Sequence, residues 1–113
     1  MIKYEVIFLE PAKFFLDNID KKSREKILFN IWKSREKNDP SLFRKLTNDI
    51  WEFRTRFKAK QFKLLAFWDK ESNISTLVIA THGFFKKTQK IPKREIEKAE
   101  QLRREYFENI KLK

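Results

Sequence analysis

The hydrophobic pattern of this chain changes its period at Ile50, and that change constrains the fold more than any other feature of the sequence. Over 21–37, apolar residues recur at the spacing of one helix face, and lysines and arginines occupy the other face. Over 51–58, apolar and charged residues alternate, as in a strand with one buried face. We therefore expect a helix before this point and the start of a sheet after it.

Further elements flank these two segments. Residues 2–9 have the pattern of a strand with one well-buried face, and Pro11 suits the first turn of a short helix after it. Two more strands are expected over 62–69 and 74–81, and an amphipathic helix over 92–109. The predicted order is β-α-α-β-β-β-α. It describes an α+β fold with helices packed on a small sheet whose last three strands form an antiparallel meander.

The length of 113 residues fits a single domain, 1–113. One Gly and three Pro are too few for a linker or a low-complexity segment. No apolar run reaches the roughly 20 residues that a membrane span needs, and the charged, alternating N-terminus does not resemble a signal peptide. We therefore expect a cytoplasmic protein.

The charge of the chain is +11, and its basic residues are clustered. Residues 53–68 and 82–94 contain no acid, and aromatic residues are interspersed with the basic ones. The basic residues of the two stretches are Arg54, Arg56, Lys58, Lys60, Lys63, Lys86, Lys87, Lys90, Lys93 and Arg94. In a meander, the two stretches should lie on neighbouring strands or at their ends, and so on one face. Cations that neutralise phosphates, with rings that stack on bases, are what single-stranded RNA binding requires. The alternative is a solvated sheet face above core aromatic residues.

Two other functions fit a chain this basic. A domain that binds RNA or the ribosome without cutting would need the same charges, because the fold alone does not fix the function. A protein of anionic membrane surfaces would need basic residues beside an exposed apolar helix face. Here the densest basic stretches flank predicted strands, which disfavours the membrane reading.

The residue types present suit RNA cleavage by the RNA's own 2′-hydroxyl group. The protein would have to orient that group, neutralise charge at the phosphate and move two protons, and arginine and lysine can supply the charge. His82 is the only histidine, and its side chain can transfer protons near neutral pH. With one His, no Cys and no evident acidic cluster, neither a metal site nor another cofactor is expected.

Several segments resemble the phage-derived HigB-like branch of the RelE superfamily of toxin–antitoxin systems. They are Leu-Thr-Asn-Asp-Ile-Trp-Glu-Phe-Arg over 46–54, Phe-Lys-Leu-Leu-Ala-Phe-Trp-Asp over 62–69, His-Gly-Phe-Phe-Lys-Lys-Thr-Gln-Lys-Ile-Pro over 82–92, and the final helix. The resemblance implies a RelE-like (RNase-barnase-like) fold with a twisted antiparallel sheet. It also implies a ribosome-dependent endoribonuclease that cleaves mRNA and is neutralised by a HigA-like helix-turn-helix antitoxin.

The resemblance also selects candidate site residues. Arg54 matches the arginine of the family's Trp-Glu-Leu-Arg strand, and Lys86 and Lys87 match its Lys-Lys pair. Phe62 and Lys63 stand where the family usually has Tyr-Arg, so a hydroxyl and a planar guanidinium are absent there. The predicted catalytic residues are Arg54, His82, Lys86 and Lys87. The predicted RNA-binding residues are Arg56, Lys58, Lys63 and Lys90.

Overall fold

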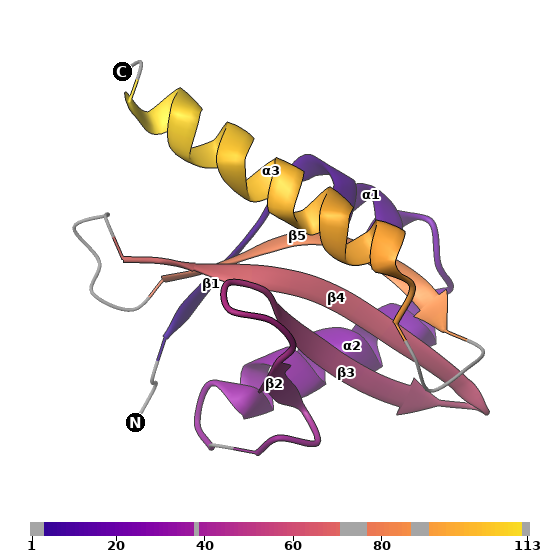
Figure 1. The fold of residues 1–113 in the computed structure, drawn as a ribbon. Coiled ribbons are helices and arrows are strands. Elements are labelled where there is room, and N and C mark those ends of the chain that lie inside the picture. Colours follow the sequence, from indigo (N-terminus) through magenta and orange to yellow (C-terminus); the bar gives the residue numbers. More distant parts are fainter. Residues whose placement is uncertain (1–3, 38, 71–76, 87–90, 112–113) are drawn as a thin grey trace.

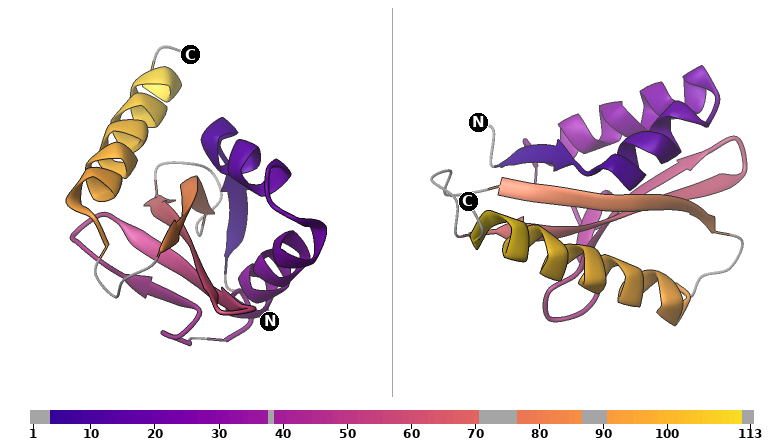
Figure 2. Two further views of the ribbon diagram at one scale, coloured as in Figure 1. Left: turned by 90° about the vertical axis from the view of Figure 1, so that its right-hand side faces the viewer. Right: turned by 90° about the horizontal axis from the view of Figure 1, so that it is seen from above.

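A five-stranded sheet forms the middle layer of the protein, with helices on both faces (Figure 1). The computed structural model describes residues 4–37, 39–70, 77–86 and 91–111. One face of the sheet is covered by α1 (Glu10–Asp17) and α2 (Lys21–Ser34), and the other by α3 (Lys93–Lys111), as the two views of Figure 2 show. The predicted α+β class is confirmed.

The strands lie in the order β1-β5-β4-β3-β2. Their bounds are β1 Glu5–Phe8, β2 Phe43–Lys45, β3 Trp51–Phe57, β4 Lys60–Asp69 and β5 Leu77–Lys86. The strands β3, β4 and β5 pair antiparallel, which confirms the predicted meander. The sheet as a whole is mixed, because β1 pairs with β5 in parallel.

The prediction of a purely antiparallel sheet in the order β-α-α-β-β-β-α was therefore wrong in two respects. The first strand lies beside β5, the last strand in sequence, and a local pattern carries no information on that distant pairing. A fifth strand, β2, precedes β3 and was missed because three residues are too few to show an alternating period.

The third strand of the meander also continues past its predicted end at Thr81. The pairing of β4 with β5 shifts there, since Leu65 pairs with His82 while Ala66 pairs with Ala80. Thr81 is the extra residue of this bulge, and the strand continues beyond it to Lys86. The first part of the predicted strand, 74–76, lies outside the described residues.

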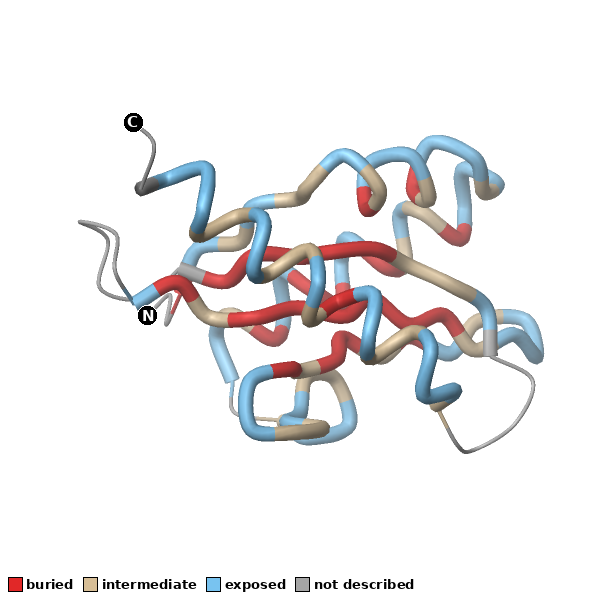
Figure 3. The backbone as a smooth tube through the Cα atoms, turned by 45° about the horizontal axis from the view of Figure 1, so that its top comes forward, coloured by how far each residue is buried: buried red, intermediate tan, exposed pale blue. Residues whose placement is uncertain are grey.

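Two separate hydrophobic clusters hold the helices on the sheet. Ala12 of α1 and Ile27 and Ile31 of α2 pack on one face, and Ala99 of α3 packs on the other. The middle strands are buried along most of their length (Figure 3). Only part of the predicted apolar stripe of α2 faces inward, because Leu28 and Trp32 are exposed.

Polar contacts complete the packing of the helices. Asp20 caps α2 by accepting a hydrogen bond from the Ser23 backbone N–H at 3.0 Å. The Tyr106 hydroxyl of α3 donates to Asp69 Oδ2 of β4 at 2.6 Å. Within the described part of the chain, no helix is long and apolar enough to cross a membrane.

Candidate functional site

The antiparallel register brings basic residues of neighbouring strands together. Arg54 of β3 pairs with Lys63 of β4, and Arg56 pairs with Gln61. Gln61 in turn pairs with Lys86 of β5. The two basic stretches of the sequence thus meet on adjacent strands, as the meander predicted.

A buried carboxylate lies at the centre of these cations. The Glu52 side chain is 0% exposed. Its Oε1 atom is 2.7 Å from Arg44 Nε and 3.4 Å from Arg54 Nε, and its Oε2 atom is 3.6 Å from Lys63 Nζ. We call Arg44, Glu52, Arg54 and Lys63 the Glu52 cluster; it combines three positive charges with one negative charge. Burial of this carboxylate is possible because the cations offset its lost hydration.

Arg54 is anchored at its base and reaches solvent. Its backbone N–H donates to Leu42 O at 2.8 Å, and its Nε atom faces Glu52, while 31% of its side chain remains exposed. Among the described residues, none is hydrogen-bonded to its terminal Nη groups. These N–H donors suit a phosphate, which a guanidinium binds through two parallel hydrogen bonds.

The other predicted RNA-binding cations differ in their placement. Lys63 is only 3% exposed and lies beneath the surface beside Glu52. Arg56 and Lys58 are exposed, and Lys58 has a φ of 50° in the turn between β3 and β4. Arg56 and Lys58 are thus accessible at the surface, whereas the predicted RNA-binding residue Lys63 is buried beneath it.

His82 is buried under the first turn of α3, and 1% of the residue is exposed. The Thr81 hydroxyl donates to Leu65 O at 3.1 Å, so Thr81 Oγ1 accepts from His82 Nδ1, also at 3.1 Å. Nδ1 then carries the proton of the neutral ring, and Nε2 lies 3.4 Å from Glu95 Oε1. Burial lowers the pKa of His82, Lys98 lowers it further, and Glu95 opposes the shift.

Residues 14–104 match the family described as phage derived protein Gp49-like (DUF891). The chain belongs to this family. A search of curated proteins gave no match.

The remaining predicted residues of this Gp49-like protein are only partly described. The backbone of Lys86 pairs with β4, but its side chain, and the whole of Lys87 and Lys90, lie outside the described residues. In the part that the structure describes, no group of three or more His, Asp or Glu residues is placed to hold a metal ion.

The sequence-based reasoning missed the two acids that organise this face. Glu52 directly precedes the acid-free stretch that was singled out, and alternation places it on the same face as Arg54. That shared face was the signal from which the ion pair could have been predicted. Glu95 gave no such signal, because its contact with His82 joins α3 to β5.

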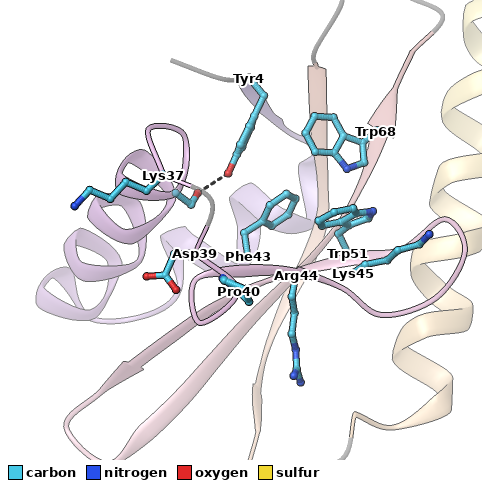
Figure 4. A pocket seen from close by; sticks show the side chains of 10 residues that line it. Tyr4, Lys37, Asp39, Pro40, Phe43, Arg44, Lys45, Trp51 and Trp68 are labelled. Carbon is cyan, nitrogen blue, oxygen red and sulfur yellow. Dashed lines mark hydrogen bonds between the residues drawn. The ribbon is translucent and has the colours of Figure 1, made fainter. Parts of the chain in front are cut away.

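The opposite face of the Gp49-like sheet carries an aromatic pocket of about 420 Å³ (Figure 4). Tyr4, Phe43, Trp51 and Trp68 line it, and all but Tyr4 are half-buried. The two tryptophans lie at the border between the core and this pocket.

Proposed function

We propose that this Gp49-like protein is the toxin of a type II toxin–antitoxin system, of the HigB-like branch of the RelE superfamily, and that it cleaves mRNA on the ribosome. The observation that carries the proposal is the Glu52 cluster. A buried carboxylate fixes the base of Arg54 while leaving its tip exposed, and the cluster keeps an excess of positive charge. A pre-oriented arginine in such a site stabilises charge that develops on a phosphate.

The proposed reaction requires no metal. The 2′-oxygen of one nucleotide forms a bond to the adjacent phosphorus while the bond from phosphorus to the 5′-oxygen breaks. The 2′-hydroxyl loses a proton and the leaving 5′-oxygen gains one, which gives a 2′,3′-cyclic phosphate and a new 5′-hydroxyl end. Arg54 would bind the phosphate as its charge rises, and Arg56, Lys58 and Lys90 would hold the neighbouring phosphates.

The two proton transfers need groups that can reach the reacting atoms. Lys86 and Lys87 are the candidates for contact with the reacting groups, and a lysine acting as base needs a strongly lowered pKa. The burial of His82 beneath α3 favours a structural role, in which its Nδ1–H bonds to Thr81 inside the fold, over direct contact with RNA.

A toxin of this kind needs an inhibitor in the same cell. We propose a HigA-like helix-turn-helix antitoxin in the cytoplasm, with an acidic surface that covers Arg54. Its gene should lie beside that of the toxin, and its co-expression should restore growth to cells that the toxin arrests.

The test of the proposed function is mapping of mRNA 5′ ends after brief expression of the toxin. New 5′-hydroxyl ends within translated messages are expected, and they should disappear when translation is blocked beforehand. If protein synthesis stops while the messages remain intact, the protein is instead a non-catalytic RNA- or ribosome-binding domain.

A further inference from the structure

The aromatic pocket has no part in the reaction proposed for the Glu52 cluster. It lies between Tyr4, the C-terminal end of α2, the strand β2 and the adjoining ends of β3 and β4, on the face that α2 covers (Figure 4). Its rings contact one another, with centroids 5.0 Å apart for Phe43 and Trp51 and 5.8 Å apart for Trp51 and Trp68. Half-buried rings of this size leave apolar surface in contact with water, which a planar ligand would cover.

The polar groups beneath the rings are already bonded. The Tyr4 hydroxyl donates to Ser34 Oγ at 2.7 Å, and the Ser34 hydroxyl donates to Ile31 O at 2.6 Å. A ligand in this pocket would therefore be held mainly by contact with ring faces. Ring stacking of this kind accepts any nucleobase, because every base has a π face.

The rim of the pocket is positively charged. Lys37, Arg44 and Lys45 line it together with one acid, Asp39. The Asp39 carboxylate accepts hydrogen bonds from the Ser41 backbone N–H at 2.9 Å and the Ser41 hydroxyl at 2.6 Å, and Arg44 is paired with Glu52. Lys37 and Lys45 are exposed and have no ion pair within the described residues. The rim thus favours an anion beside the rings.

We propose that this pocket binds one nucleotide of single-stranded RNA. The base would lie against Trp51 and Trp68, and its phosphate would be bound by Lys45. The volume of about 420 Å³ is in the range of small-ligand sites. This inference rests on the proposed function only in taking the nucleotide as part of the RNA that is cut.

Arg44 connects the pocket with the candidate catalytic face. It lines the pocket, and its guanidinium contacts Glu52 on the other face of the sheet. An RNA strand that crosses the edge strand β2 would pass from the aromatic rings to Arg54. The pocket would then hold a nucleotide at a distance from the cleaved bond and contribute to binding independently of catalysis.

The test uses tryptophan fluorescence of the full-length Trp32→Phe variant. Trp32 is exposed on α2, so its removal leaves only Trp51 and Trp68, both in the pocket, as tryptophan reporters. Nucleoside 5′-monophosphates and a pentaribonucleotide should quench the emission in a saturable manner. Ribose 5-phosphate, which lacks a base, should bind at least about tenfold more weakly, since base stacking is lost.

Matched charge variants locate the site. Lys45→Glu in the same background should weaken nucleotide binding about tenfold, because it reverses a charge at the rim. Lys22→Glu makes the same charge change on exposed α2 and should leave binding within about twofold of the parent, because salt screens distant charges.

Three results would overturn the proposal. The first is that no nucleotide quenches the emission saturably up to about 10 mM. The second is that ribose 5-phosphate binds as tightly as the nucleotides, and the third is that Lys45→Glu and Lys22→Glu weaken binding equally. The first would leave the rings as a contact surface for a protein partner. Quenching by nucleoside 5′-monophosphates involves no cleavage, so failure of the proposed cleavage and failure of this site are distinguishable.

Discussion

The ring of Phe15 occupies the space that a side chain at position 83 would need. A Cβ atom built on Gly83 would lie 2.3 Å from Phe15 Cδ2, and the glycine has no positive φ. The only glycine of the chain is therefore required for the close approach of α1 to β5. The sequence shows a single glycine, but only the structure identifies Phe15 as the residue that approaches it.

Gly83→Ala should destabilise the fold by about 1–3 kcal/mol, the usual range for an overpacked core. The change should be measured by urea unfolding of the single variant and of the same substitution in a Phe15→Leu background. The leucine side chain is smaller and has no ring, so it should remove much of the clash with the new methyl group. The effects of the two substitutions on the free energy of unfolding should therefore be non-additive. An equal loss in both backgrounds would show that the Phe15 contact is not the cause.

The buried position of His82 predicts a specific pH dependence of stability. In the unfolded chain His82 binds its proton near its ordinary pKa of about 6.5. Its pKa is lower in the fold, so between the two values the unfolded chain holds more protons. Stability from this residue is therefore complete above about pH 6.5 and falls as the pH decreases toward the folded-state pKa.

This prediction is checked by urea unfolding of wild-type and His82→Asn proteins between pH 7.5 and pH 5, a range that includes the ordinary histidine pKa of about 6.5. The difference in the free energy of unfolding between the two proteins should shrink on acidification, by at most about 1.4 kcal/mol per pH unit. Carboxylates that titrate in both proteins cancel in this difference. A difference that stays constant, or grows as the pH falls, would contradict the account.

At the scale of elements, one carboxylate ties three strands together. Glu52 of β3 contacts Arg44 of β2 and Lys63 of β4. The hydrophobic period predicted β3, β4 and the helices, because these elements are long enough to repeat it. It predicted neither β2, which has three residues, nor the parallel pairing of β1 with β5, which joins segments far apart in the sequence.

Glu52→Gln should lower the free energy of unfolding by about 3 kcal/mol, because it leaves buried positive charge without its counter-ion. Glu97→Gln is the matched control, since Glu97 is 61% exposed and lies 3.9 Å from Lys93 Nζ on α3. That variant should lose no more than about 0.5 kcal/mol. Equal denaturation midpoints for the two variants would show that the cluster does not stabilise the sheet.

At the scale of the whole molecule, the basic residues that give the net charge of +11 differ in how deeply they are buried. The sequence correctly predicted that basic residues of β3, β4 and β5 adjoin one another. It did not predict that Lys63 is buried and Arg56 exposed, because charge patterns carry no information on depth. The exposed cations are the ones expected to exchange counter-ions for RNA phosphates.

RNA affinity should therefore fall steeply with salt, with a slope of about −0.7 per phosphate neutralised on single-stranded RNA. Anisotropy of a labelled oligoribonucleotide at several salt concentrations measures this slope. Arg56→Ala should make it shallower by about 0.7, and Lys22→Ala, on the α2 face, should not change it. The same slope in wild type and Arg56→Ala would show that Arg56 does not contact an RNA phosphate.

The central claim is that the Arg54 face cuts mRNA on the ribosome, and primer extension in a purified translation system tests it most directly. Wild-type protein and Arg104→Ala, which removes an equal charge from exposed α3, should produce new 5′ ends only when ribosomes are present. Arg54→Ala should slow their appearance by about 10²–10³-fold, the usual effect of losing one group that stabilises charge in the transition state. Translation arrest with intact mRNA, or cleavage by Arg54→Ala at the wild-type rate, would contradict the claim that the Arg54 face cuts mRNA.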